Sequence, residues 1–216
     1  MGVLAIIPAY NEENTIKETV ETTLKYCDVV VVDDCSSDNT YKIIKSLPIH
    51  TIRNKDNLGY ELTLVQGLKH AIEKNYDYAI TLDGDGQLSP SYIPKFINAL
   101  KEGNKLVVGN RNSKTRWSEY LISIIGSIIW NISDPFCGLK GYDLKLIKKL
   151  PLYTRPSIGT EIAIKIAKSK QPVKNVSIEV LKRNGDSRIG KNDLTTNFYF
   201  LKCFLRNIFI KNLPVQ

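Results

Sequence analysis

Two acidic side chains, Asp83 and Asp85, stand two residues apart directly after an apolar run at residues 78–82. Gly84 separates them, and Gln87 follows a second glycine. Like charges this close raise each other's pKa unless a cation lies between them. Carboxylate oxygens on a tight turn suit Mg²⁺ or Mn²⁺, which usually keep phosphate oxygens among their ligands. The segment is therefore a candidate metal site for a phosphorylated ligand, although an isolated turn of this kind can equally close a hairpin in solvent.

Two further polar clusters also follow apolar runs. Residues 8–12 come after the run at 3–7, and Asp33 and Asp34 come after the run at 29–32. In open α/β sheets, ligands bind outside the carboxyl ends of the strands, so we expect the three clusters to share one edge. The chain has neither a GxGxxG motif after its first run nor a GxxxxGK[ST] motif, which argues against a dinucleotide fold and a P-loop. An acidic edge favours a diphosphate bound through a metal, as in a nucleotide sugar.

The elements that must position these residues alternate along the first half of the chain. Short β-branched runs alternate with helical patterns, and we predict that Asn11 caps the first helix. Near-continuous apolar strands separated by helices indicate a parallel sheet covered on both faces. The predicted class is α/β, with a Rossmann-like, mostly parallel sheet in one domain of 216 residues. The predicted strands are residues 3–7, 29–32, 49–52, 78–82 and 106–108.

The composition of the chain limits which kinds of molecule it is expected to bind. The formal charge of +8 indicates a polyanionic partner, such as a phosphorylated ligand, an anionic membrane surface or nucleic acid. No nucleic-acid-binding signature accompanies the charge and the acidic edge opposes one, so we expect no nucleic acid. The four cysteines lack metal-site spacing and are interpreted as free thiols in a reducing compartment. No apolar run reaches the roughly 18 residues that span a bilayer.

The order of the motifs resembles that of family 2 glycosyltransferases. Two later segments, residues 134–139 and 182–188, resemble the D-x-x-x-G-F and R-x-x-G-x-S-K elements of the dolichol-phosphate mannosyltransferase and polyprenyl-phosphate glycosyltransferase branch. The resemblance covers about residues 6–190 and implies a GT-A fold. The earlier motifs that carry it lie at residues 7–13, 31–38, 57–59, 83–87 and 108–111.

The resemblance also implies roles for individual residues. Asp85 and Arg111 would be catalytic, and a Mg²⁺ or Mn²⁺ ion would be held by Asp83, Asp85 and Gln87. The donor would contact Pro8, Tyr10, Glu12, Asp33, Asp34, Asp83, Gly84, Asp85, Lys182, Arg183 and Arg188. The acceptor would contact Arg111, Arg116, Ser123 and Ser187.

Several of these roles have plainer alternatives. Glu12 can serve only the dipole of the first helix, and Gln87 can be an ordinary turn residue. One of Asp33 and Asp34 can be only a helix or turn cap. Asp34 is the one expected to accept hydrogen bonds from the base of the nucleotide. Lys182 and Arg188 stand where the family has Arg and Lys, which leaves open whether Lys182 or Arg183 reaches phosphate. Residues 57–59 are predicted to be a turn without a chemical role.

Two amphipathic segments indicate a membrane interface. In residues 120–131, Tyr120, Ser123, Ser127 and Asn131 face away from an apolar stripe. Residues 194–210 are rich in aromatic side chains beside Lys202 and Arg206. The alternatives are a core helix and a docked terminal helix. We predict a peripheral protein on the cytoplasmic face of the membrane. The stripe consists of Leu121, Ile124, Ile125, Ile128 and Ile129.

The predicted activity is a metal-dependent, inverting transfer of a hexose of the mannose or glucose type. The donor would be a GDP- or UDP-linked sugar, and the acceptor a polyprenyl or dolichyl phosphate. A phosphate monoester is mostly ionised at pH 7 and needs no strong general base. The alternatives are a soluble family 2 enzyme using a saccharide or protein hydroxyl, with Asp134 or Glu161 as base, and a non-catalytic scaffold. Within one domain, residues 1–112 would bind the donor, 113–193 the acceptor, and 194–216 would form the amphipathic helix.

Overall fold

A seven-stranded sheet forms the centre of the molecule in the computed structural model, which describes residues 1–114, 116–150, 152, 157–181 and 194–208. The strand order is β3-β2-β1-β4-β6-β5-β7, and β6 alone runs antiparallel to its two neighbours. The strands are β1 (Val3–Ala9), β2 (Asp28–Asp33), β3 (His50–Arg53), β4 (Tyr78–Thr81), β5 (Leu106–Arg111), β6 (Lys140–Asp143) and β7 (Val173–Ile178).

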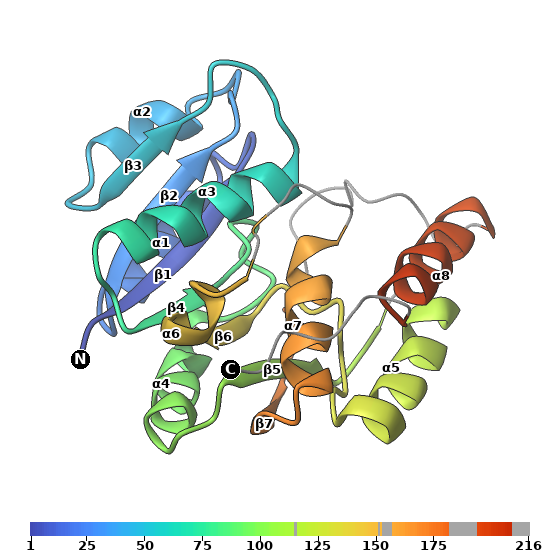
Figure 1. Ribbon diagram of the computed structural model, residues 1–216. Coiled ribbons are helices and arrows are strands. Elements are labelled where there is room, and N and C mark those ends of the chain that lie inside the picture. The colour runs from blue at the N-terminus through green and yellow to red at the C-terminus, as the bar shows by residue number, and fades with distance from the viewer. Residues whose placement is uncertain (115, 151, 153–156, 182–193, 209–216) are drawn as a thin grey trace.

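Helices pack on both faces of the sheet, as predicted (Figure 1). Because β1 is buried on both sides, Leu4 and Ile6 enter one core while Ala5 and Ile7 enter the other. The first core takes in α3 (Tyr60–Glu73), α6 (Leu144–Ile147) and α7 (Ile158–Lys168). The second core takes in α1 (Ile16–Thr23), α2 (Thr40–Lys45), the 3₁₀ turn η1 (Pro90–Tyr92) and α4 (Ile93–Lys101).

Strand β6 was not predicted from the sequence. Its residues Lys140-Gly141-Tyr142-Asp143 form no apolar run, yet all four are buried between β4 and β5. Polar residues in a central strand break the hydrophobic pattern from which strands are recognised. The sheet is therefore mixed rather than wholly parallel.

The first helix begins later than expected. Asn11 adopts a left-handed conformation (φ 51°), and α1 starts at Ile16 behind Thr15, so Asn11 is not its cap. The Asn11 Oδ1 atom instead accepts a hydrogen bond from the backbone N–H of Ser37 at 2.8 Å. The Asn11 side chain thus connects the loop after β1 to the loop after β2 at the edge of the sheet.

Two helices form a layer beside α7. α5 (Trp117–Trp130) and α8 (Leu194–Ile208) come from distant parts of the chain but lie side by side (Figure 1). Trp130 and Phe204 pack edge to face between them, with ring centroids 5.6 Å apart. Neither they nor any other helix in the described ranges is long and apolar enough to cross a membrane.

Candidate functional site

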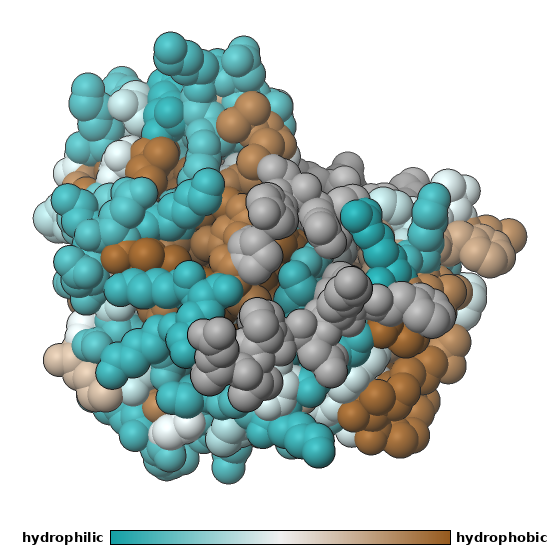
Figure 2. Space-filling model, viewed as in Figure 1, coloured by the Kyte–Doolittle hydropathy of each residue, from teal (hydrophilic) through white to brown (hydrophobic). Residues whose placement is uncertain are grey.

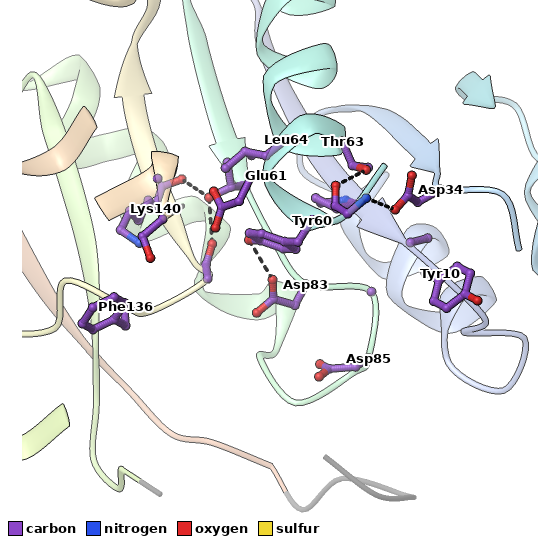
Figure 3. Close-up of a pocket in the computed structure, with 18 of the residues that line it drawn as sticks. Tyr10, Asp34, Tyr60, Glu61, Thr63, Leu64, Asp83, Asp85, Phe136 and Lys140 are labelled. Atoms are coloured by element: carbon purple, nitrogen blue, oxygen red, sulfur yellow. Dashed lines mark hydrogen bonds between the residues drawn. The ribbon is translucent and has the colours of Figure 1, made fainter. Parts of the chain in front are cut away.

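A cavity of about 510 Å³ opens where β1, β2 and β4 end. The sequence-predicted residues that line it are Pro8, Tyr10, Glu12, Asp34, Asp83, Gly84 and Asp85. α3, β6, α8 and the loop before β6 supply much of the remaining wall. Figure 3 shows Tyr60 and Glu61 of α3, Lys140 of β6 and Phe136 of that loop. Three polar clusters that were expected at one sheet edge therefore meet in one cavity.

Asp83 lies on the wall between the sheet and α3. The Tyr60 hydroxyl donates a hydrogen bond to its Oδ1 atom at 3.1 Å (Figure 3). Burial and the nearby charge of Asp85 raise the pKa of Asp83 to about 6. The site thus holds a carboxylate whose ionised form is disfavoured. A cation bound beside it would stabilise that ionised form.

Gly138 makes this position of Asp83 possible. A Cβ atom on residue 138 would lie 2.0 Å from the Asp83 Oδ2 atom. The carbonyl oxygen of Gly138 accepts a hydrogen bond from the Thr81 hydroxyl at 2.7 Å, which fixes the backbone against β4. The glycine of the later sequence motif is therefore part of the site because its backbone abuts the carboxylate.

Asp85 is oriented by its own turn. The backbone N–H of Gln87 donates to the Asp85 Oδ1 atom at 3.0 Å, and Gly86 supplies a positive φ of 73°. Gln87 does not line the cavity, and its backbone N–H shapes the turn, so metal binding by its side chain stays a prediction.

Asp83 and Asp85 have the chemistry of a weak magnesium-type site. No group of three or more His, Cys, Asp or Glu residues suited to a metal is found in the described part of the chain. Mg²⁺ is usually bound by one or two protein carboxylates, with ligand phosphates and water completing its shell. Two cavity-lining carboxylates therefore fit a divalent cation that arrives with a phosphorylated ligand.

Asp34 and Asp33 point to different surroundings. The Asp34 carboxylate accepts hydrogen bonds from the backbone N–H groups of Leu58 (2.9 Å) and Gly59 (2.8 Å) and from the Asn54 amide (2.8 Å). Asp33 is fully buried with Arg53 Nε at 3.3 Å, and it does not line the cavity. The turn at residues 57–59, to which the sequence assigned no role, thus positions Asp34.

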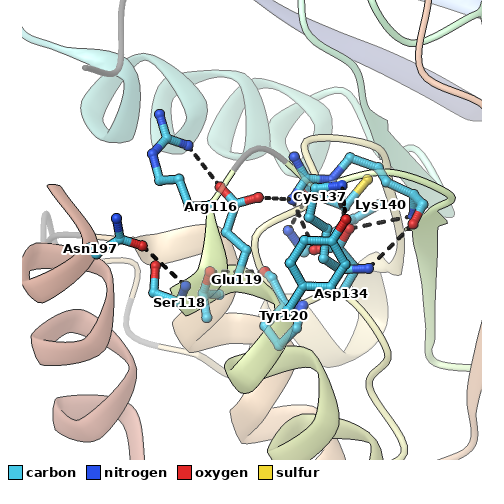
Figure 4. Close-up of polar contacts among 12 residues, drawn as sticks. Arg116, Ser118, Glu119, Tyr120, Asp134, Cys137, Lys140 and Asn197 are labelled. Atoms are coloured by element: carbon cyan, nitrogen blue, oxygen red, sulfur yellow. Dashed lines mark hydrogen bonds and ion pairs between the residues drawn. The ribbon is translucent and has the colours of Figure 1, made fainter. Parts of the chain in front are cut away.

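Arg111 and Arg116 belong to a buried charge cluster beside the cavity. Arg111 binds Asp134 through Nε (2.7 Å) and Nη2 (3.0 Å), and its Nη2 atom also lies 3.3 Å from Glu119. Arg116 donates to Glu119 at 2.8 Å (Figure 4). Its guanidinium also stacks 4.9 Å from the ring centre of Phe200. We call Arg111, Arg116, Glu119 and Asp134 the arginine cluster; it ties β5, α5 and α8 together.

The other residues predicted to contact the acceptor either lie away from the cavity or fall outside the described residues. Ser123 is half-buried on α5 and does not line the cavity. Lys182, Arg183, Ser187 and Arg188 lie outside the described residues. None of the described acceptor residues enters the cavity, so their contact with a ligand stays a prediction.

The structure adds residues that sequence reasoning missed. Glu61 lines the cavity, and burial raises the pKa of its carboxyl, which also accepts the backbone N–H of Ile158 at 2.6 Å. Tyr199 and Phe200 line the cavity from α8. Lys140 does so from β6, one residue beyond the D-x-x-x-G-L segment, which was the signal that could have found it.

The two acids considered as bases are engaged elsewhere. Asp134 is buried against Arg111, and Glu161 is buried with Lys165 Nζ at 2.6 Å. Neither lines the cavity. A carboxylate bound to a cation on the protein is poorly placed to accept a proton from a ligand.

Paired acids in a cavity at the carboxyl ends of the strands are typical of an α/β enzyme that binds a phosphorylated ligand. Comparison with known proteins identifies the family. Residues 4–134 match the model of glycosyl transferase family 2. The match spans more than half of the chain, and the chain belongs to that family. It is a glycosyltransferase.

Two curated relatives are similar to the chain over most of its length. The UDP-N-acetylglucosamine–dolichyl-phosphate N-acetylglucosaminyltransferase of Methanococcus voltae is 31% identical over 180 residues, which cover 68% of this chain and 72% of that relative. The dolichol-phosphate mannosyltransferase of Pyrococcus furiosus is 31% identical over 190 residues, covering 77% of this chain and 52% of that protein.

Solved structures confirm the GT-A fold. The glucosyl-3-phosphoglycerate synthase of Mycobacterium tuberculosis, solved with Mn²⁺, uridine diphosphate and phosphoglyceric acid, superposes with a TM-score of 0.77. It is 16% identical, and the alignment covers 98% of this chain and 80% of that one. At this identity the likeness concerns the fold alone.

Proposed function

We propose that the protein transfers a hexose, with inversion, from a UDP- or GDP-linked sugar to a polyprenyl phosphate, with the help of Mg²⁺ or Mn²⁺. The carrying observation is the double role of α8. This helix contributes Tyr199 and Phe200 to the acidic cavity and exposes Leu194, Phe198 and Leu205 on its outer side. One element thus borders both a candidate nucleotide-sugar site and an apolar surface, as an enzyme with a lipid-linked acceptor requires.

The donor side rests on the residues at the carboxyl ends of the parallel strands. Asp34 and Tyr10 line the end of the cavity next to β1 and β2, where the nucleoside would bind, and Asp83 and Asp85 would face the diphosphate. A divalent cation held by Asp83 and Asp85 would offset the charge of the departing diphosphate. The Mn²⁺ and uridine diphosphate of the mycobacterial neighbour and the donors and acceptors named for the archaeal relatives support this assignment.

The acceptor side needs positioning more than proton transfer. A phosphate monoester with a second pKa of about 6 is already mostly ionised at pH 7. Asp134 and Glu161 are paired with Arg111 and Lys165, in agreement with a nucleophile that requires no carboxylate base. We assign Arg111 and Arg116 to the side from which the acceptor phosphate approaches. The halves predicted from the sequence, 1–112 for the donor and 113–193 for the acceptor, would then meet at the end of β5, where Arg111 lies, and residues after 112 also line the donor cavity.

The apolar outer face of α5 would meet the membrane. Leu121, Ile124, Ile128 and Ile129 are exposed, Ile128 at 79% of its surface, and Figure 2 shows a brown patch over α5. Ile125 differs from them because it is half-buried against the core. Exposed Lys202 and Arg206 on the neighbouring α8 would meet anionic headgroups. This interfacial face supports a peripheral position on the membrane, whose cytoplasmic side remains our proposal.

A competition assay tests the proposed function. The protein is incubated with Mn²⁺, a labelled UDP- or GDP-hexose, farnesyl phosphate and an equimolar saccharide, and the products are partitioned between butanol and water. We expect label in the butanol phase, dependent on farnesyl phosphate. Label on the saccharide alone would contradict the proposal.

Glu61 supports a second candidate, transfer to a hydroxyl acceptor. It lines the cavity with a raised carboxyl pKa, as suits a general base near neutral pH. Glu61→Gln separates the two functions. Under our proposal this variant retains most transfer to farnesyl phosphate, whereas an enzyme that uses Glu61 as base loses about 10²-fold or more of its activity on a hydroxyl.

A further inference from the structure

Lys140 occupies an unusual place for a lysine. It is the first residue of β6, paired with Thr81 of β4 on one side and Val108 of β5 on the other, in the interior of the sheet. Only 4% of its surface is exposed, and what remains open faces the cavity (Figure 3). A buried ammonium group is costly unless it is paired or hydrogen-bonded.

The protein satisfies this ammonium group only in part. Its Nζ atom donates a hydrogen bond to the carbonyl oxygen of Cys137, and an ammonium group has three donors. Among the described residues, no carboxylate oxygen lies within 4.0 Å of the Lys140 Nζ atom, so the lysine forms no ion pair there. Two donor positions are thus left without a described protein acceptor.

The surrounding charges place Lys140 between two groups of residues. Asp83 of the cavity and Asp134 of the arginine cluster act on it from longer range, and Arg111 adds a charge of its own sign. Figure 4 shows Asp134 near Lys140. Burial lowers the pKa of Lys140 more than these acids raise it. The lysine therefore stands where the donor cavity meets the arginine cluster, with a charge that its neighbours compensate incompletely.

The geometry points to Lys140 as an anion-binding residue that takes a phosphate oxygen of the ligand at this junction. A phosphate oxygen beside Nζ would supply the missing acceptor and much of the missing charge, because charge-assisted hydrogen bonds are short and strong. The phosphate can belong to the donor diphosphate or to the acceptor monoester. This inference rests on the proposed function for its choice of ligands.

Three variants test the role of Lys140. Lys140→Met keeps the length of the side chain without its charge, and Lys140→Gln also keeps a donor for the Cys137 carbonyl. Lys148→Met removes one exposed lysine elsewhere and so matches the change in net charge. Calorimetric titration with UDP and with GDP, each with Mn²⁺, reports the diphosphate; the KM for farnesyl phosphate reports the monoester.

We expect both Lys140 variants to weaken one of these two constants by about tenfold or more, the loss typical of a hydrogen bond to a charged group. Weaker nucleotide binding assigns the lysine to the diphosphate, and a raised KM assigns it to the acceptor. Lys148→Met should change neither constant, and the thermal midpoint of Lys140→Gln should stay near that of the wild type.

Unchanged constants in Lys140→Gln would overturn the inference, as would a lowered thermal midpoint as its only effect. If Lys140→Met fails to fold, Lys140→Gln decides. A wild type that binds UDP or GDP but does not use farnesyl phosphate would contradict the proposed acceptor. The nucleotide titration would then decide the role of Lys140 by itself, and an unchanged affinity would overturn it.

Discussion

At the scale of single residues, the site depends on how closely Asp83 is enclosed. Tyr60 donates to its carboxylate, Gly138 lies against it, and Asp85 adds a second negative charge. The enclosure disfavours the ionised form of Asp83, which a bound cation would favour again. Two predictions follow from this enclosure.

The first concerns stability as a function of pH. The pKa of Asp83 is raised from 3.8 to about 6, so between these values the folded state binds more protons than the unfolded state. Stability therefore falls as pH rises through this window, by roughly 3 kcal/mol for a shift of this size. Asp83→Asn should stabilise the metal-free protein at pH 7.5 and leave it nearly unchanged at pH 4. Urea unfolding in EDTA at both pH values measures this, and equal effects at both would show that ionisation is not the cause.

The second concerns Gly138. In Gly138→Ala the new methyl group would meet the Asp83 carboxylate, so the side chain or the backbone must shift. We expect a loss of Mn²⁺-dependent nucleotide binding of about tenfold or more, in line with one lost charged contact. Gly159→Ala is the matched control, since its Cβ would make only ordinary contacts, the nearest at 3.4 Å from Leu64. Equal nucleotide affinity in both variants would refute the role of Gly138.

At the scale of elements, the arginine cluster joins the end of β5 to α5 and α8. Arg111 is bidentate to Asp134, and Arg116 stacks on Phe200. Because both acids of the cluster are buried, removing one cation leaves a charge without compensation. The cluster thus stabilises the layer that carries the proposed acceptor side.

Arg111→Ala should for this reason lower the free energy of unfolding by about 3 kcal/mol or more. Arg111→Met combined with Asp134→Asn removes both charges and should recover part of the loss. Thermal and urea unfolding of the two variants give the comparison. If Arg111→Ala is as stable as the wild type while its KM for farnesyl phosphate rises, Arg111 binds ligand rather than the cluster.

Some helices and strands could be predicted from the sequence and others could not. Strands β1, β2 and β4 were predicted because buried parallel strands are continuous apolar runs, and the acids after them marked the cavity. β6 was missed because Lys140 and Asp143 interrupt its pattern. The Arg111–Asp134 pair joins residues 23 positions apart through tertiary packing, which no local periodicity encodes. Asn11 looked like a cap because its type fits one, but its left-handed backbone bridges two loops instead.

At the scale of the molecule, the layer of α5 and α8 exposes an apolar outer face, and α8 also borders the acidic cavity through Tyr199 and Phe200. This layer lies beside the sheet (Figure 1). The cavity opens where β1, β2 and β4 end. Under our proposal, a membrane against the outer face would lie next to α8, which borders the cavity. Binding of this kind is reversible and weakens as salt screens the basic side chains.

Exposed isoleucines on α5 test the membrane contact. Ile124→Asp with Ile128→Asp should reduce co-sedimentation with anionic vesicles by about tenfold or more, because two apolar anchors become charged. The fold and nucleotide affinity should persist because both side chains point outward. Tyr26→Asp changes an exposed aromatic residue outside this layer and should have no effect. Unaltered vesicle binding in the double variant would refute the interfacial face.

The linkage in the product tests the central claim most directly. Wild-type protein is given Mn²⁺, an α-linked nucleotide hexose and farnesyl phosphate, and the purified lipid product is analysed by proton and phosphorus NMR. We predict a phosphodiester between the anomeric carbon and the lipid phosphate, with the anomeric configuration inverted relative to the donor. A product with the α configuration retained, or sugar attached only to a hydroxyl or released into water, would contradict the account.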